Sequence, residues 1–191
     1  MPIVAGSLLV VLTVAGCSSL ERRTAQPTAE PALSNSIRPS AGLPQRPQDL
    51  PTAGVDPCSL IPTDQRNVLE IDRPPLPGPD PVFGGMQCSN SVAAWGVYIV
   101  AVSSSSTASK WLTNSTPSNN AVTSVAGYPA VTTYDPRLVN TCLVVVDTSD
   151  TGLIAALISD RRVTATTGRD QLCARTIAAA AIALGSLQAR R

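Results

Sequence analysis

The stretch that constrains the fold most strongly is residues 141–159, which has the sequence TCLVVVDTSDTGLIAALIS. Two apolar runs, residues 141–147 and 151–159, flank the polar triplet Thr148-Ser149-Asp150. Runs of aliphatic and β-branched residues that are separated by Thr, Ser and Asp are typical of two strands joined by a turn. The stretch therefore predicts an antiparallel β-hairpin.

Further strands are predicted upstream of this hairpin. Apolar runs indicate strand structure within residues 87–102, 121–125 and 128–134, and the last two flank a turn at Gly127. The intervening stretch 73–85 is rich in Pro and Gly and predicts a loop. We expect an antiparallel sheet of about five strands.

Helical signals flank these strands on both sides. Asp56 is a suitable N-cap with Pro57 at the first helical position, and a helical pattern continues to about residue 70. A short helix is predicted over residues 107–113, and an alanine-rich helix over residues 170–187. The elements together predict an α+β fold in which the sheet packs against N-terminal and C-terminal helices.

Composition limits the classes of function. The formal net charge is +1 and only 14% of the residues are charged, so no electrostatic field favours nucleic acid or anionic lipid heads. The chain has no histidine, which is the side chain that most often acts as a general base or binds transition metals. Nucleic-acid binding and metal-dependent chemistry are therefore not expected.

The N-terminal residues have the pattern of an export signal. Residues 1–16 hold an apolar run without charge that is shorter than the roughly 20 residues of a membrane-spanning helix and matches a signal-peptide core. The run ends in Val14-Ala15-Gly16-Cys17, which resembles the lipobox of bacterial lipoprotein precursors. The resemblance implies cleavage before Cys17 and a diacylglycerol on its thiol, which anchors the protein to the outer face of the plasma membrane. The alternatives are an ordinary signal peptide with a chance cysteine, or a buried apolar strand.

The signal begins without its usual positive charge. Met1 and Pro2 precede the apolar run, whereas a signal peptide normally carries Lys or Arg there. We therefore predict that translation starts upstream of Met1, which mapping of the translation start would test.

A polar segment separates the lipobox from the folded part of the chain. Residues 17–54 are rich in Pro, Ser, Thr and Ala and show no periodic apolar pattern. Such a composition does not bury enough surface to offset the entropy of ordering. We predict a flexible tether over residues 17–54 and a globular extracytoplasmic domain over residues 55–191. Weakly ordered loops on the domain are the alternative.

Four cysteines remain in the domain once Cys17 is assigned to lipid: Cys58, Cys88, Cys142 and Cys173. An even count in an exported chain predicts two disulfides, and the wide spacing without a histidine argues against zinc. Three connectivities are possible, and spacing alone does not choose between them. The order of the predicted elements favours Cys58–Cys88 and Cys142–Cys173, because loops can return the chain in each case.

Several motifs together resemble a known family. They are the lipobox, the Pro-rich segment, the four cysteines, and the stretches Asp56-Pro57-Cys58-Ser59-Leu60-Ile61 and Val125-Ala126-Gly127-Tyr128-Pro129. This arrangement is similar to the actinobacterial lipoproteins of domain-of-unknown-function family 3558. The resemblance covers about residue 56 to the C-terminus and implies an envelope lipoprotein with disulfides. It implies no catalytic residues.

No catalytic constellation is evident in the sequence. Ser109 and Lys110 are neighbours on a predicted helix, so their side chains do not face each other as a dyad would require. Asp147, Asp150 and Asp160 lie at predicted strand ends or turns, where Asp is common for backbone reasons. We predict neither an enzyme nor a bound cofactor or metal.

The predicted function is that of a non-enzymatic binding or interaction module of the cell envelope. The alternatives are a carrier of lipid or glycolipid, with an apolar cleft between sheet and helix, and an accessory subunit of an envelope protein complex. Trp95, Tyr98 and Trp111 are half of the aromatic residues and could line such a cleft, although core positions are the commoner role.

Overall fold

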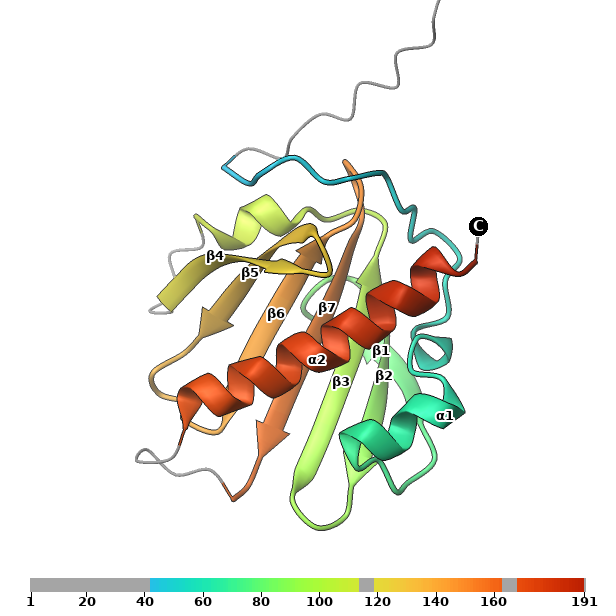
Figure 1. The fold of residues 1–191 in the computed structure, drawn as a ribbon, viewed down its shortest axis with the longest axis vertical. Coiled ribbons are helices and arrows are strands. Elements are labelled where there is room, and N and C mark those ends of the chain that lie inside the picture. The colour runs from blue at the N-terminus through green and yellow to red at the C-terminus, as the bar shows by residue number, and fades with distance from the viewer. Residues whose placement is uncertain (1–41, 114–118, 163–167, 191) are drawn as a thin grey trace, which may run out of the picture. The chain divides into compact units, whose positions relative to one another are not determined.

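The described part of the chain is built on one sheet. The computed structural model describes residues 42–113, 119–162 and 168–190 (Figure 1). Seven antiparallel strands lie in the order β1-β2-β3-β7-β6-β5-β4. They are β1 (Leu76–Asp80), β2 (Gly85–Val92), β3 (Gly96–Ser103), β4 (Asn119–Val125), β5 (Tyr128–Tyr134), β6 (Thr141–Asp147) and β7 (Leu153–Asp160). The α+β fold is confirmed, whereas the expected count of about five strands was too low.

The extra strands come from the segment before Trp95. Residues 73–85 were predicted to be a loop, but β1 lies within them, and residues 87–102 contain two strands joined by a turn instead of one. Prolines at positions 77 and 79 made β1 look irregular. An edge strand tolerates them because it hydrogen-bonds to a single neighbour, here β2, through alternate residues.

The predicted hairpin over residues 141–159 is confirmed as β6 and β7, which lie near the middle of the sheet. The hairpin of β4 and β5 also agrees with the prediction. Its two turn residues, Ala126 and Gly127, both have positive φ angles of 46° and 83°. Positive φ at both central residues is the requirement of the tight type I′ hairpin turn.

One long helix, α2 (Arg169–Gln188), crosses one face of the sheet (Figure 1). Before β1 the chain forms η1 (Pro57–Ser59), α1 (Thr63–Arg66) and η2 (Asn67–Leu69). The Asp56 side chain caps η1 by accepting a hydrogen bond from the Cys58 amide, as predicted. None of the helices among the described residues is long and apolar enough to cross a membrane.

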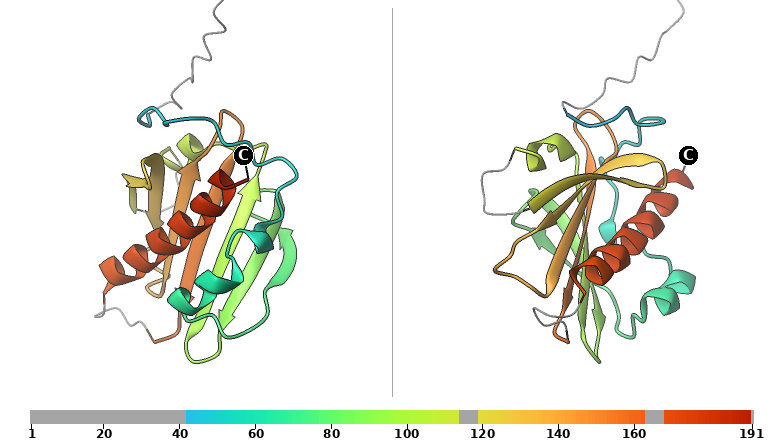
Figure 2. Two further views of the ribbon diagram at one scale, coloured as in Figure 1. Left: turned by 45° about the vertical axis from the view of Figure 1, so that its right-hand side comes forward. Right: turned by 60° about the vertical axis from the view of Figure 1, so that its left-hand side comes forward.

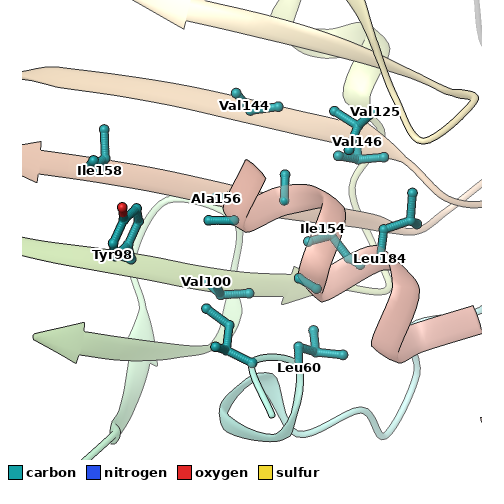
Figure 3. Packing of buried hydrophobic residues seen from close by; sticks show 14 of the residues in the cluster. Leu60, Tyr98, Val100, Val125, Val144, Val146, Ile154, Ala156, Ile158 and Leu184 are labelled. Carbon is teal, nitrogen blue, oxygen red and sulfur yellow. The ribbon is translucent and has the colours of Figure 1, made fainter. Parts of the chain in front are cut away.

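The main core lies between α2 and this face of the sheet (Figure 3). Alternate residues of the central strands point toward the helix, because side chains on a strand alternate between the two faces. They include Tyr98, Val100, Val144, Val146, Ile154, Ala156 and Ile158. The buried residues of the helix include small ones such as Ala179, Ala180 and Ala183, so the helix backbone approaches the strands closely.

Two disulfides connect the helical layer to the sheet. Cys58 of η1 is bonded to Cys88 of β2, with 4.9 Å between their Cα atoms. Cys142 at the start of β6 is bonded to Cys173 in the first turns of α2, with 5.3 Å between their Cα atoms. These are the pairs that the order of the predicted elements favoured.

Part of the predicted tether belongs to the folded domain. Residues 42–54, here called the strap, pack along one end of the sheet. Leu50 is buried and its amide donates to the Thr148 carbonyl at 2.7 Å, while the Thr52 hydroxyl donates to the Ser103 carbonyl at 2.6 Å. A boundary at residue 54 was therefore too late. The sequence of the strap shows no apolar periodicity, because only isolated residues such as Leu50 and Thr52 attach it to the rest of the domain.

Candidate functional site: an apolar groove on the open face of the sheet

The second face of the sheet lies opposite α2 and is only partly covered. Figure 2 shows the short helix η3 (Ala108–Trp111) on this side and α2 on the other. Ala101, Val145, Leu153 and Ala155 form the floor of a second apolar cluster, on which Leu43 of the strap also packs. The strap and η3 thus cover one part of this face and leave another part open.

The uncovered part forms a groove. Its volume is about 440 Å³, which is within the range of small-molecule sites. The floor consists of residues from four neighbouring strands, β2, β3, β7 and β6, and the walls come from η3 and from the turn between β1 and β2. The apolar side chains that line it include Val82, Phe83, Ile99, Ala101, Trp111, Leu143, Ala155 and Leu157.

Two aromatic side chains form the wall. The rings of Phe83 and Trp111 pack against each other with centroids 5.1 Å apart. Phe83 is fixed by its backbone, because its carbonyl accepts a hydrogen bond from the Ser103 hydroxyl at 3.1 Å. The contact ties the turn between β1 and β2 to η3.

Two polar side chains, those of Asp80 and Gln87, also line the groove. Asp80 is the last residue of β1 and is 5% exposed. Its Oδ1 atom accepts hydrogen bonds from the Val82 and Phe83 amides, at 2.7 and 3.2 Å, and so holds the turn. Its Oδ2 atom is buried and has no hydrogen-bond partner. Gln87 of β2 lines the groove nearby.

The three aromatic residues considered from the sequence divide between the two faces. Trp95 and Tyr98 are core residues on the α2 side, 1% and 2% exposed, with ring centroids 5.3 Å apart. Trp111 lines the groove on the other side. The space between the sheet and α2, where a cleft was expected, is occupied by the main core.

The acids considered from the sequence serve structural contacts. Asp147 and Asp150 each accept a hydrogen bond from the guanidinium of Arg46 in the strap, and Asp147 does so at 3.0 Å. Asp49 of the strap is a third ionic partner of Arg46. Although burial disfavours the charged guanidinium, these carboxylates raise the pKa of Arg46 above its usual range.

Asp160 at the end of β7 belongs to a second ionic contact. Arg162 donates to it through Nε and Nη2 at 3.1 and 3.0 Å, and Arg175 of α2 donates at 2.7 Å. Burial alone would raise the pKa of this carboxyl group, but the hydrogen bonds from the two arginines outweigh it and lower the pKa to about 2. Arg175 also lies over the Trp95 ring at 4.0 Å.

The other residues considered from the sequence gain no new role from the structure. Lys110 lies on η3, and the neighbouring Ser109 hydroxyl contacts the Thr107 hydroxyl at 3.2 Å. Among residues 42–113, 119–162 and 168–190, no cluster of three or more His, Cys, Asp or Glu side chains could hold a metal ion. Cys17 and the predicted signal peptide lie outside the described residues.

A family model spans the strands, the disulfides and most of α2. The model described as protein of unknown function (DUF3558) matches residues 12–186. The chain belongs to this family. The match starts within the predicted signal peptide and therefore includes Cys17 as well as the groove. No protein with curated annotation and no solved structure gives a significant match. Family membership therefore brings no activity with it, and function has to be argued from the geometry.

The residues that build the groove were not singled out by the sequence, apart from Trp111. Asp80 and Phe83 lie in the stretch predicted as a loop, and Gln87 is a polar residue in a weakly apolar strand. A partial signal exists in the alternation of β3 and β7, where both faces are apolar. Strands that are apolar on both faces are expected to be covered on both.

Proposed function

We propose that this family member is a lipid-anchored protein of the cell envelope whose domain binds an apolar small molecule in the groove. The observation that carries the binding function is the apolar lining of a hollow of about 440 Å³ beside a well-packed second cluster. Apolar surface left open to water costs roughly 25 cal/mol per Å², so a ligand that covers it gains that free energy. The function needs no catalytic group and no cofactor.

The anchor is the second part of the proposal. Lipid on Cys17 would hold the domain at the outer face of the plasma membrane, and the two disulfides suit that oxidising compartment. Metabolic labelling with an alkyne fatty acid tests it in the native host. We expect labelling of the full chain and its loss in Cys17→Ala, together with release of the protein from the membrane. A fully labelled Cys17→Ala protein would contradict the anchor.

Binding can be tested with the neutral fluorescent probe N-phenyl-naphthylamine. Leu157 is partly buried on the groove floor, so Leu157→Trp fills the groove with little effect on the main core. We expect probe fluorescence to rise when the wild-type protein is added. The apparent affinity for the probe should fall about tenfold or more in Leu157→Trp, because the new side chain takes up apolar contact area in the groove that the probe would otherwise cover, roughly that of one buried side chain.

A matched control enlarges an apolar side chain elsewhere. Leu138 is 52% exposed and lies outside the groove, so Leu138→Trp should leave binding unchanged. Trp111→Ala, which removes a wall, should also weaken binding. Equal affinity of the wild type and Leu157→Trp would show that the groove is not the site.

A further inference from the structure

The unpartnered carboxylate oxygen of Asp80 suggests what kind of molecule enters the groove. The Oδ1 atom of Asp80 accepts hydrogen bonds from two amides of the turn between β1 and β2. The other, Oδ2, has no donor although the residue is only 5% exposed. Buried polar atoms are nearly always hydrogen-bonded, and a buried charged group without a partner is costly.

The sheet register places this side chain on the groove side. Asp80 pairs with Gly85, and Gln87 lies two residues further along β2 opposite Ala101 of β3. Residues two apart on a strand share a face, so Asp80, Gln87 and Ala101 lie on the open face of the sheet. All three line the groove.

No cation of the described chain fills this position. The ion pairs among the described residues involve Asp49, Asp72, Asp135, Asp147, Asp150, Asp160 and Glu70, and none involves Asp80. A carboxylate accepts hydrogen bonds and donates none, so its natural complement is a donor, and the best complement is a positively charged one.

We propose that Asp80, with Gln87 beside it, selects amphiphiles that combine an apolar body with a cationic amine head. The apolar lining holds the body, and the amine donates to Asp80 Oδ2 at the end of the groove. A hydroxyl head offers a weaker version of the same hydrogen bond, whereas a carboxylate head would place two acceptors against each other. This inference rests on the proposed function, because it names the ligand class of the same groove.

Three probes with one alkyl chain and different heads test the selection: decylamine, decanol and decanoate. Displacement of N-phenyl-naphthylamine from the wild-type protein measures each affinity. We expect decylamine to bind roughly tenfold or more tightly than decanol, because a charge-assisted hydrogen bond is about twice as strong as a neutral one. Decanoate should bind most weakly.

Asp80→Asn is the decisive variant. Asn keeps an acceptor for the turn amides and replaces the unpartnered Oδ2 acceptor with a donor, so folding should be preserved, which thermal unfolding would check. We expect the preference for decylamine over decanol to disappear and decanoate to gain affinity. Asp64→Asn is the control, since it removes an exposed acid on α1 and should leave the order of the three probes unchanged.

The outcomes separate the two proposals. If Leu157→Trp blocks all three probes but Asp80→Asn leaves their order unchanged, the groove binds apolar molecules and the role of Asp80 is wrong. If wild-type protein prefers decanoate, the head-group selection is also overturned. If none of the probes binds the wild-type protein, or Leu157→Trp leaves their binding unaltered, both proposals fail.

Discussion

Ala126 has a strained backbone conformation that Asn would tolerate better. Its φ angle is 46°, and it precedes Gly127 in the two-residue turn between β4 and β5. Positive φ costs a residue with a Cβ about 1–2 kcal/mol, and Asn tolerates it better than Ala. We predict that Ala126→Asn, which creates the favoured Asn-Gly pair, raises the free energy of unfolding by about 0.5–1 kcal/mol. Urea denaturation measures the change.

The control is another turn alanine. Ala94 lies exposed in the turn between β2 and β3, and its φ angle is not positive. Ala94→Asn should therefore bring no gain. Equal stabilisation by both substitutions would show that relief of strain at Ala126 is not the cause.

Asp160 makes stability depend on pH in a defined direction. Its pKa is lowered in the folded protein to about 2 by donors from Arg162 and Arg175, which outweigh the opposing effect of burial. A carboxyl group whose folded pKa lies below the unfolded value of about 3.9 stabilises the fold above that pH and stops doing so as pH falls toward the folded pKa. We predict that Asp160→Asn costs about 1–3 kcal/mol at neutral pH. The difference in unfolding free energy between the variant and the wild type should shrink as the pH falls from about 4 toward 2. Thermal unfolding of both proteins at each pH measures this difference.

Asp135 supplies the matched comparison for this prediction. Its pKa is also lowered to about 2, chiefly by hydrogen bonds from Arg137, but the pair lies on the surface. Water and salt screen such pairs. Asp135→Asn should change stability much less than Asp160→Asn, and a similar loss in both would contradict a dominant role for burial at Asp160.

At the scale of elements, the two disulfides hold different parts of the helical layer. Cys142–Cys173 holds the first turns of α2, whose N-cap residue Gly168 offers no side-chain hydrogen bond. Its loop of 31 residues predicts a loss of about 3–4 kcal/mol when both cysteines become Ala, in the chain-entropy model. Hydrogen exchange should show the amides near Leu172 losing protection first.

The other disulfide gives a control of nearly equal loop length. Cys58–Cys88 spans 30 residues, so its removal should cost a similar free energy. The first turns of α2 should then keep their protection relative to the rest of the protein. Early loss of protection in α2 in both variants would mean that the helix is held by the fold as a whole.

The elements also show how far the sequence predicts this fold. The β6–β7 hairpin, the β4–β5 hairpin and α2 were predictable because each has a strong local pattern. β1 was not, because its prolines are acceptable only at the edge of a sheet, and a position in the sheet is not a local property. The groove shares this difficulty: Asp80 and Trp111 are 31 positions apart and meet only through the sheet and η3.

At the scale of the whole molecule, the strap makes the end of the predicted tether a structural part of the domain. The Arg46 side chain is fully buried and contacts Asp49, Asp147 and Asp150. Leu43 and Leu50 are 6% and 1% exposed and pack on opposite sides of the sheet, one in each apolar cluster. These contacts fix the strap to both faces of the sheet.

Truncation tests this role of the strap. A chain beginning at Gly42 keeps every described contact, whereas a chain beginning at Val55 loses two buried leucines and Arg46, which pairs with buried Asp147. Each leucine contributes about 1.5–3 kcal/mol, and removal of one partner from a buried pair costs about 3–5 kcal/mol. These losses approach the total stability of roughly 5–15 kcal/mol for a typical domain.

We therefore predict that the chain from Gly42 unfolds cooperatively at nearly the temperature of the longer protein, and that the chain from Val55 is largely unfolded or melts far lower. Circular dichroism with temperature measures both. Arg46→Met in the longer chain gives an intermediate case, because it keeps the leucines and removes the cation. If the chain from Val55 were as stable as the chain from Gly42, the strap would contribute nothing to the stability of the domain. The boundary predicted at residue 54 would then be the boundary of the stable folding unit.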